Sequence, residues 1–231
     1  MSDPLPLRAR FAASRDTIAR SEAITQEHTT EGATLDSTFF QLAQLPKMES
    51  STCPQFPPSQ VTVVNLDAFT AARNIMRENS DARGKTSVLN LASDIYRAGD
   101  WINSLTKTQE EALCYSSTLY ATLKEEWYPW ANTGDGSDAG IYSPGIVIFK
   151  DDLDHACVDL QVSDRRVVSI ITVAAPRHPW LTEDELEFED PSVLEDLRKK
   201  ILLVYRMAVH HGQHYLVLGT LSNIFPFATE G

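Results

Sequence analysis

The sequence predicts an α/β layered domain, in which a sheet is covered by helices. Segments with strand character alternate with segments at helical spacing, and the connections between them are short. Two strand-like runs, beginning at Val88 and Val167, are apolar almost throughout, as in strands buried on both faces of a sheet. A chain of 231 residues is long enough for one such domain with a sizeable core and too short for two comfortable ones.

The N-terminal region precedes this alternation and differs from it in composition. Residues 5–23 are predicted to form a helix with Phe11, Ile18 and alanines on one side and four arginines on a solvated face. Residues 29–58 are rich in Thr, Ser, Pro and Gln, which predicts an extended linker or wrapping loop. The predicted organisation is an N-terminal helix and linker over residues 1–60 and one domain over residues 61–231.

The domain is predicted to begin with a β-branched strand and a helix that Asp67 or Thr70 caps. The interior Pro144-Gly145 pair predicts a bulge in the third strand. The predicted strands are residues 61–64, 88–91, 141–150, 167–175 and 215–219, and the predicted helices are residues 68–78, 108–126 and 191–211. The residues at core spacings in the last helix are Val193, Leu194, Leu197, Ile201, Val204 and Ala208.

The charge of the chain restricts its partners. A formal net charge of -12 argues against direct nucleic-acid binding, because Lys and Arg neutralise the phosphates in such complexes. An anionic ligand is still compatible with this charge, since backbone N–H groups in a turn or at a helix N-terminus can bind it. The N-terminus lacks a signal-peptide core and no run of about eighteen apolar residues occurs, so we expect no membrane association and an intracellular location, cytoplasmic or nuclear.

The cysteines do not indicate a metal or redox site. Cys53, Cys114 and Cys157 are odd in number, widely spaced and without a C-x-x-C pair, so neither a disulfide framework nor a zinc site is predicted. Cys114 is better interpreted as a small apolar residue on a helix than as a nucleophile.

Two groups of potential metal ligands also have simpler explanations. An acidic group after the third strand lacks the ligand spacing of a known metal-binding loop, so we expect it to decorate a turn. It consists of Asp151, Asp152, Asp154 and His155. Histidines near Gly212 are typical of a helix C-terminus, and they are His210, His211 and His214. No metal site is predicted.

The stretch most informative about function is residues 88–119. Asn90 interrupts the apolar strand that begins at Val88, as in a strand that ends at a site, and a loop then leads to a helix from Thr108. Glu110 and Glu111 lie in the first turn of that helix, where carboxylates complement the helix dipole. Such pairs often only face water, but a helix start beside a strand end is where open α/β sheets bind ligands.

Several motifs resemble those of poly(ADP-ribose) glycohydrolases, whose signature is a Gly-Gly-Gly triplet followed by Gln-Glu-Glu. Here Gln109-Glu110-Glu111 follows a loop ending in Gly99-Asp100-Trp101. The chain is similar to the microbial-type branch, particularly its fungal members, from about residue 8 to residue 219. The further matching motifs, in the same order, are Gly-Ile-Tyr-Ser-Pro at 140–144, Val-Ala-Ala-Pro-Arg at 173–177, Arg-Met-Ala at 206–208 and Tyr-Leu-Val-Leu-Gly at 215–219.

The resemblance implies a macrodomain-like three-layer α/β/α sandwich with a mixed sheet, extended by the N-terminal helix. It implies hydrolysis of ribose–ribose O-glycosidic bonds in poly(ADP-ribose) on modified proteins, without a metal or dissociable cofactor. Glu111 would be the general acid, with a pKa raised toward neutrality, and Glu110 would orient the ribose hydroxyls. The ligand-binding residues would be Asn90, Ser93, Gly99, Asp100, Trp101 and Gln109, with Gln109 fixing the geometry of the glutamates.

Two departures from the family pattern fall on loops that face phosphate. Where the family has Pro-Gly-Gly-Gly-Trp, residues 97–101 read Arg-Ala-Gly-Asp-Trp, so Ala98 and Asp100 replace two glycines. After residue 219 the family continues into a second glycine-rich loop, a helix and more sheet, whereas this chain ends at Gly231, which predicts a C-terminally incomplete domain. The alternatives are therefore a non-catalytic ADP-ribose-binding macrodomain and a destabilised, truncated family member.

Overall fold

The computed structural model describes residues 4–47, 49, 51, 61–184 and 186–219. The strands are β1 (Thr38–Gln41), β2 (Thr86–Leu91), β3 (Ala139–Ile148), β4 (Arg166–Val173) and β5 (Tyr215–Val217). The α-helices are α1 (Leu7–Glu27), α2 (Ala68–Glu78), α3 (Trp101–Ser104), α4 (Gln109–Ser116), α5 (Leu119–Thr122) and α6 (Pro191–His210). The strands form one mixed sheet in the order β1-β3-β4-β2-β5, in which β2 is parallel to β4 and β5. Residues 220–231 and Cys53, which enter the predictions above, lie outside the described residues.

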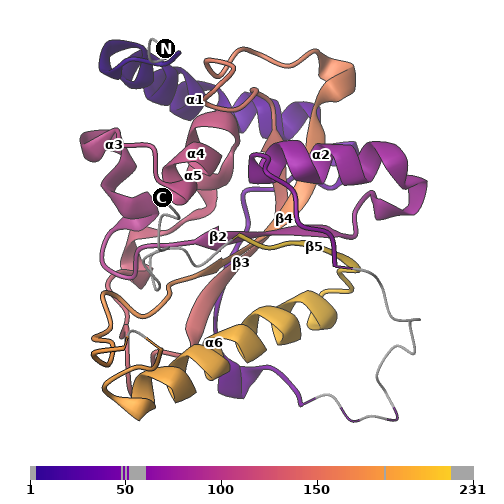
Figure 1. The fold of residues 1–231 in the computed structure, drawn as a ribbon. Coiled ribbons are helices and arrows are strands. Elements are labelled where there is room, and N and C mark those ends of the chain that lie inside the picture. The colour runs from indigo at the N-terminus through magenta and orange to yellow at the C-terminus, as the bar shows by residue number, and fades with distance from the viewer. Residues whose placement is uncertain (1–3, 48, 50, 52–60, 185, 220–231) are drawn as a thin grey trace.

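Helices cover both faces of the sheet (Figure 1). α6 packs on one face, and α2, α4 and α5 pack on the other, with α1 outside α4. Val88 and Ile170 belong to the core cluster on the α4 side, whereas the next residues, Leu89 and Ile171, belong to the cluster beneath α6. Because successive strand residues point to opposite faces, β2 and β4 are buried on both sides. The predicted three-layer α/β/α sandwich with a mixed sheet is confirmed.

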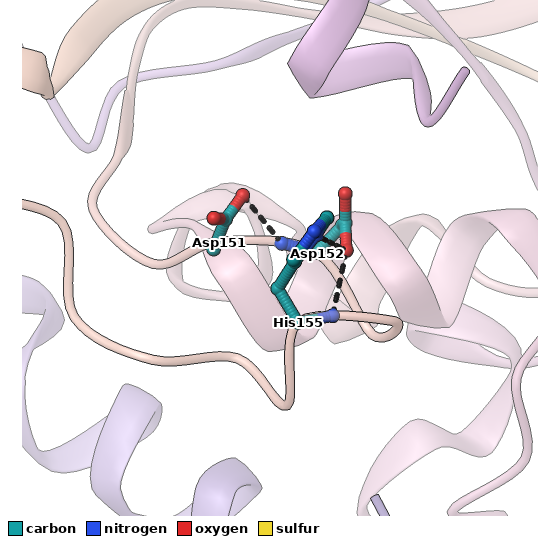
Figure 2. A group of neighbouring side chains, drawn as sticks. All are labelled: Asp151, Asp152 and His155. Atoms are coloured by element: carbon teal, nitrogen blue, oxygen red, sulfur yellow. Dashed lines mark hydrogen bonds and ion pairs between the residues drawn. The ribbon is translucent and has the colours of Figure 1, made fainter. Parts of the chain in front are cut away.

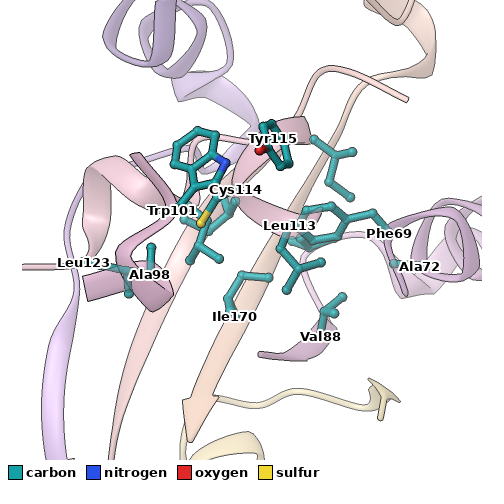
Figure 3. Packing of buried hydrophobic residues seen from close by; sticks show 14 of the residues in the cluster. Phe69, Ala72, Val88, Ala98, Trp101, Leu113, Cys114, Tyr115, Leu123 and Ile170 are labelled. Atoms are coloured by element: carbon teal, nitrogen blue, oxygen red, sulfur yellow. The ribbon is translucent and has the colours of Figure 1, made fainter. Parts of the chain in front are cut away.

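The core on the α4 side forms where this helix meets the sheet and the loop before it (Figure 3). Trp101 is fully buried and meets the ring of Tyr115 edge to face, with 5.1 Å between the ring centroids. Leu113 and Cys114 are also fully buried in this cluster. Burial raises the pKa of the Cys114 thiol, so this cysteine is a packed apolar residue, as predicted.

Two predictions for the chain before α2 are wrong. Residues 61–64 form no strand, and Val61 and Val63 are 86% and 89% exposed, because β-branched residues need a partner strand to form a sheet. The segment predicted as a linker instead contains β1, which pairs antiparallel with β3. Phe39 and Phe40 of β1 pack on opposite faces of the sheet, which explains how so short a strand is held. The division of the chain at residue 60 stays a prediction.

The helix predicted over residues 108–126 is interrupted. α4 ends at Ser116, and Ser117 is extended at φ -146°, forming a bridge to Ile148 of β3. The Ser117 hydroxyl donates to the carbonyl of Leu113 and accepts the amide of Leu119. Three successive hydroxyl residues, 116–118, offer the backbone such alternatives to helical bonds, and the helix stops there. The bulge predicted in β3 is present, as a register shift between Ser143 and Ile146.

The N-terminal helix was predicted correctly, but its buried face was not. Phe11 and Ile18 are 51% and 40% exposed. Serine and threonine hydroxyls can donate to backbone carbonyls of their own helix, as Ser21 does to Thr17 at 2.7 Å. Such residues can therefore be buried against α4. The buried residues of α1 are Ser14, Thr17, Ser21, Ile24 and Thr25.

The core-facing side of α6 also differs from the prediction. Leu194 and Ile201 are 39% and 44% exposed, whereas Asp196 and Lys200 are buried. Lys200 donates to a backbone carbonyl of the loop before β3 at 2.8 Å, and Asp196 accepts a backbone N–H of the same loop at 2.7 Å. This polar loop, rather than an apolar surface, faces the first half of the helix. The other buried residues are Leu203, Val204, Met207 and Ala208.

Candidate functional site

The first turn of α4 is attached to the end of β2 by a side chain. Thr108 caps the helix, because its hydroxyl accepts the amide of Glu111. The Gln109 side chain donates to the carbonyl of Leu89 at 2.9 Å and accepts the amide of Leu91 at 2.9 Å. The amide nitrogen and the amide oxygen of Gln109 thus both bond to β2, which fixes where the two following glutamates lie.

Glu110 is buried and hydrogen-bonded at both carboxylate oxygens. Its side chain accepts from Asn90 Nδ2 at 3.1 Å and from the backbone N–H of Ser93 at 2.8 Å. Burial raises the pKa of Glu110 to about 8, against the lowering effect of these two donors, and the nearby Glu111 adds to the rise. Asn90 also donates to the Thr172 hydroxyl at 3.2 Å, which accounts for a polar residue within a buried strand.

Glu111 is 1% exposed, but only one of its oxygens is satisfied. Oε1 accepts from the hydroxyl of Ser104 at the end of α3. Oε2 is buried and has no hydrogen-bond partner among the described residues. Buried carboxylate oxygens nearly always have a donor, so this atom is suited to interact with a ligand.

The loop facing the glutamates has a left-handed backbone. Ala98, Gly99 and Asp100 have φ values of 52°, 62° and 64°, a conformation that costs non-glycine residues free energy. A Cβ at Gly99 would lie 3.3 Å from Glu110 Oε2, so a larger residue here would crowd the carboxylate. The Asp100 side chain accepts from Asn103 Nδ2 at 2.7 Å. The turn that three glycines would favour therefore forms with only one glycine.

The structure brings most of the predicted site residues together. Asn90, Ser93 and Gly99 adjoin Glu110, whereas Glu111 contacts Ser104. Gln109 bonds to the backbone of β2 next to them. Asp100 lies at the edge of the left-handed loop, and Trp101 is buried in the core cluster. Sequence reasoning missed Ser104, whose contact with Glu111 no sequence spacing indicated, and Thr172, whose only signal was a hydroxyl in an apolar strand.

The acidic group after β3 has the hydrogen bonds of a turn (Figure 2). Asp151, Asp152 and His155 offer ligand atoms within 4.8 Å of one another, and Asp154 is not part of this group. Asp152 accepts from the His155 backbone N–H at 2.9 Å and contacts its ring at 2.7 Å, while Asp151 pairs with Arg73 at 2.6 Å. The carboxylates of Asp151 and Asp152 thus accept hydrogen bonds from donors of the protein itself.

The histidines near Gly212 lie at a helix end, as predicted. α6 ends at His210, and Gly212 follows at φ 66°, the left-handed conformation typical of a helix C-terminus. The His211 ring stacks on Tyr142 with 3.6 Å between the ring centroids, and burial lowers the pKa of His211 to about 4.

The fold is an α/β domain with a mixed sheet between two helical layers. Its buried carboxylate pair lies at a helix start beside the ends of the parallel strands, which is where α/β domains bind ligands. Residues 12–151 match the model of the microbial-type PARG catalytic domain, where PARG denotes poly(ADP-ribose) glycohydrolase. The chain belongs to this family. The matched range includes β2, the left-handed loop and both glutamates.

Solved structures agree with this assignment. The chain is similar to PARG from Thermomonospora curvata, with 23% identity, a TM-score of 0.72 and coverage of 93% of this chain and 80% of that one, which shows the fold. It is also similar to PARG from Deinococcus radiodurans in complex with ADP-ribose, with 31% identity, a TM-score of 0.54 and coverage of 68% and 60%. No match is found among curated proteins. Within the described residues, none of the helices has the length and apolar character needed to cross a membrane.

Proposed function

We propose that this domain binds ADP-ribose units between the left-handed loop and the start of α4, and hydrolyses the ribose–ribose O-glycosidic bonds of poly(ADP-ribose) on modified proteins. The observation that carries the proposal is the buried Oε2 of Glu111, which has no donor among the described residues, next to Glu110, which has two. The Deinococcus relative, crystallised with ADP-ribose, supports the choice of ligand.

The two glutamates have different tasks in this proposal. Glu111 gives a proton to the leaving ribose oxygen as the C–O bond breaks, and then takes a proton from the water that attacks the oxocarbenium-like carbon. Glu110 is held by Asn90 and Ser93, and with a pKa of about 8 it carries a proton at neutral pH. It can therefore donate a hydrogen bond to a ribose oxygen and orient the sugar. The chemistry needs no metal or dissociable cofactor.

A second candidate function, binding ADP-ribose without hydrolysis, is favoured by Asp100. This residue adds a carboxylate to the loop whose backbone N–H groups would face the diphosphate. Repulsion between the two weakens the complex and displaces the scissile bond from Glu111, and a displaced bond reacts slowly however tightly the ligand binds.

We also propose that the protein belongs to the fungal type of this family and acts inside the cell, in the cytoplasm or nucleus. The free thiols of Cys114 and Cys157 support a reducing compartment. The sequence motifs given above support the fungal type.

The test combines a glutamate substitution with two measurements. Glu111→Gln keeps the shape of the side chain but cannot transfer a proton, so hydrolysis of poly(ADP-ribose) should fall by about 100-fold or more. The calorimetric Kd for ADP-ribose should change by less than about threefold, and the exposed Glu126→Gln should match the parent in both assays.

Each outcome separates the candidates. A parent that binds ADP-ribose but hydrolyses nothing supports the binding function, and a parent that does neither contradicts both. Equal hydrolysis by Glu111→Gln and the parent would remove Glu111 from the mechanism.

A further inference from the structure

A buried carboxylate lies beside the candidate site and belongs to none of the steps above. Asp94 follows Ser93 in the chain, is 2% exposed, and forms an ion pair with Arg177 at 3.0 Å through Nε. Asp94 comes after β2 and Arg177 comes after β4, and these parallel strands are neighbours that end side by side. The ion pair therefore spans the edge of the sheet at which α/β domains bind ligands.

Both ends of the ion pair are anchored by backbone hydrogen bonds. The carbonyl of Asp94 accepts the amide of Trp130 at 3.0 Å. Asn132 accepts the amide of Arg177 at 2.8 Å and donates to the carbonyl of Ala175 at 2.9 Å. Arg177 is thus fixed at its backbone, while its side chain is 51% exposed and its Nε lies 3.0 Å from Asp94 Oδ1 in an ion pair without hydrogen-bond geometry. Its two terminal nitrogens, Nη1 and Nη2, have no partner among the described residues.

The other cations near the site are occupied. Arg97, at the start of the left-handed loop, donates to the carbonyl of Tyr120 at 2.6 Å, and its guanidinium lies 3.9 Å from the Tyr120 ring centroid. Lys200 is 2% exposed and donates to the carbonyl of Ser137. Arg177 is a half-exposed cation at this edge, where Asp100 supplies negative charge.

We propose that Arg177 binds a phosphate group of the ligand at the ends of β2 and β4, and that Asp94 is the positioning residue that holds its guanidinium. An arginine held through Nε presents Nη1 and Nη2 as a fork that matches two phosphate oxygens. The fixed backbone and ion pair reduce the entropy lost when the ligand binds. This inference rests on the proposed function for the identity of the ligand, a nucleoside diphosphate sugar.

The experiment measures the Kd for ADP-ribose by calorimetry at low and high salt. Arg177→Gln should weaken binding about tenfold at low salt and less at high salt, because the lost interaction is between charges. The Kd of Arg177→Lys should lie between those of the parent and Arg177→Gln, since lysine keeps the charge but lacks the two terminal nitrogens of arginine. Asp94→Asn should weaken binding severalfold by releasing Arg177. The control is Arg83→Gln, the same charge change in the exposed turn before β2, which should shift Kd by less than twofold.

A purely structural role for the ion pair predicts another pattern. Arg177→Gln would then lower Tm and weaken binding equally at both salt concentrations, and that result would overturn the proposal, as would unchanged affinity. Inorganic pyrophosphate, titrated separately, distinguishes failure of the inference from failure of the proposed function. If the parent binds pyrophosphate through Arg177 but not ADP-ribose, the nucleotide function is wrong and the phosphate site stands. If neither ligand binds in a manner that depends on Arg177, the inference is wrong.

Discussion

Both ends of α4 are buried and polar, but only at one of them do all the polar groups compared here have partners within the protein. At the C-terminal end, the carbonyl of Tyr115 accepts from the Thr17 hydroxyl of α1 at 2.9 Å, and the carbonyl of Ser116 accepts two amides of the chain after β3. Lys150, which is 4% exposed, contacts oxygens of Thr17, Asp16 and Ala13 there. At the N-terminal end, Glu111 Oε2 has no such partner in the part of the chain that the structure describes.

This difference shows which buried polar groups stabilise the fold and which are available for a ligand. A helix leaves its last carbonyls without intrahelical partners, and α1 and the chain after β3 supply donors for those of α4. At the other end, the cost of burying Glu110 outweighs its two hydrogen bonds and raises its pKa. The C-terminal end should therefore govern stability, and the N-terminal end should govern pH dependence and binding.

The largest expected effect concerns Glu110. Its pKa is about 8 in the folded state and near 4.5 when unfolded, so between these values the folded state holds a proton that the unfolded state has lost. Stability should fall by a few kcal/mol as pH rises through this window, and Glu110→Gln should remove this dependence. Urea unfolding of both proteins at pH 5 to 8 measures it, with the exposed Glu22→Gln as control. A parent-minus-mutant difference that is constant with pH would show that Glu110 titrates normally.

A smaller effect on stability is expected at the other end of α4. Lys150→Met keeps a long apolar stem but removes the donors to Thr17, Asp16 and Ala13, so the free energy of unfolding should fall by about 1 to 3 kcal/mol. The exposed Lys199→Met on α6 loses the same charge and should be within about 0.5 kcal/mol of the parent. ADP-ribose affinity of the folded protein should be unchanged. A Lys150 variant as stable as the control would mean that the polar contacts do not hold α1 in place.

The sequence predicted the central sheet because β2 and β4 are apolar on both faces, a pattern that burial enforces directly. It missed the buried face of α1, since residues such as Thr17 carry no apolar period and are buried through hydrogen bonds that depend on tertiary contacts. The strand at residues 61–64 was wrongly predicted for the converse reason, because Val61 has strand propensity without a partner.

The candidate site was predictable only in part. Glu110 and Glu111 could be selected because a helix start and a strand end are both visible in the sequence. Ser104, Asp94 and Arg177 could not, since their partners are determined by how loops meet in space. The left-handed backbone at Ala98 is also beyond sequence reasoning, which assigns such geometry to glycine.

The smallest expected effect separates charge from backbone geometry in the left-handed loop. Asp100 is at φ 64°, which Asn tolerates as well as Asp does, so Asp100→Asn removes the carboxylate while keeping the turn. If the carboxylate repels the diphosphate, ADP-ribose should bind about fivefold more tightly, or about 1 kcal/mol, at low salt. The gain should shrink at high salt as screening shortens the range of the repulsion. Ala98→Gly together with Asp100→Gly should add a second gain that does not depend on salt, because removing both Cβ atoms lets the diphosphate approach the backbone N–H groups. Calorimetric titration of the parent, the single variant and the double variant at two salt concentrations measures both parts. If Asp100→Asn binds no more tightly than the parent at low salt while the double variant does, the loop is limited by access to its backbone. The side chains of Ala98 and Asp100 would then limit binding by their bulk, and the charge of Asp100 would not matter.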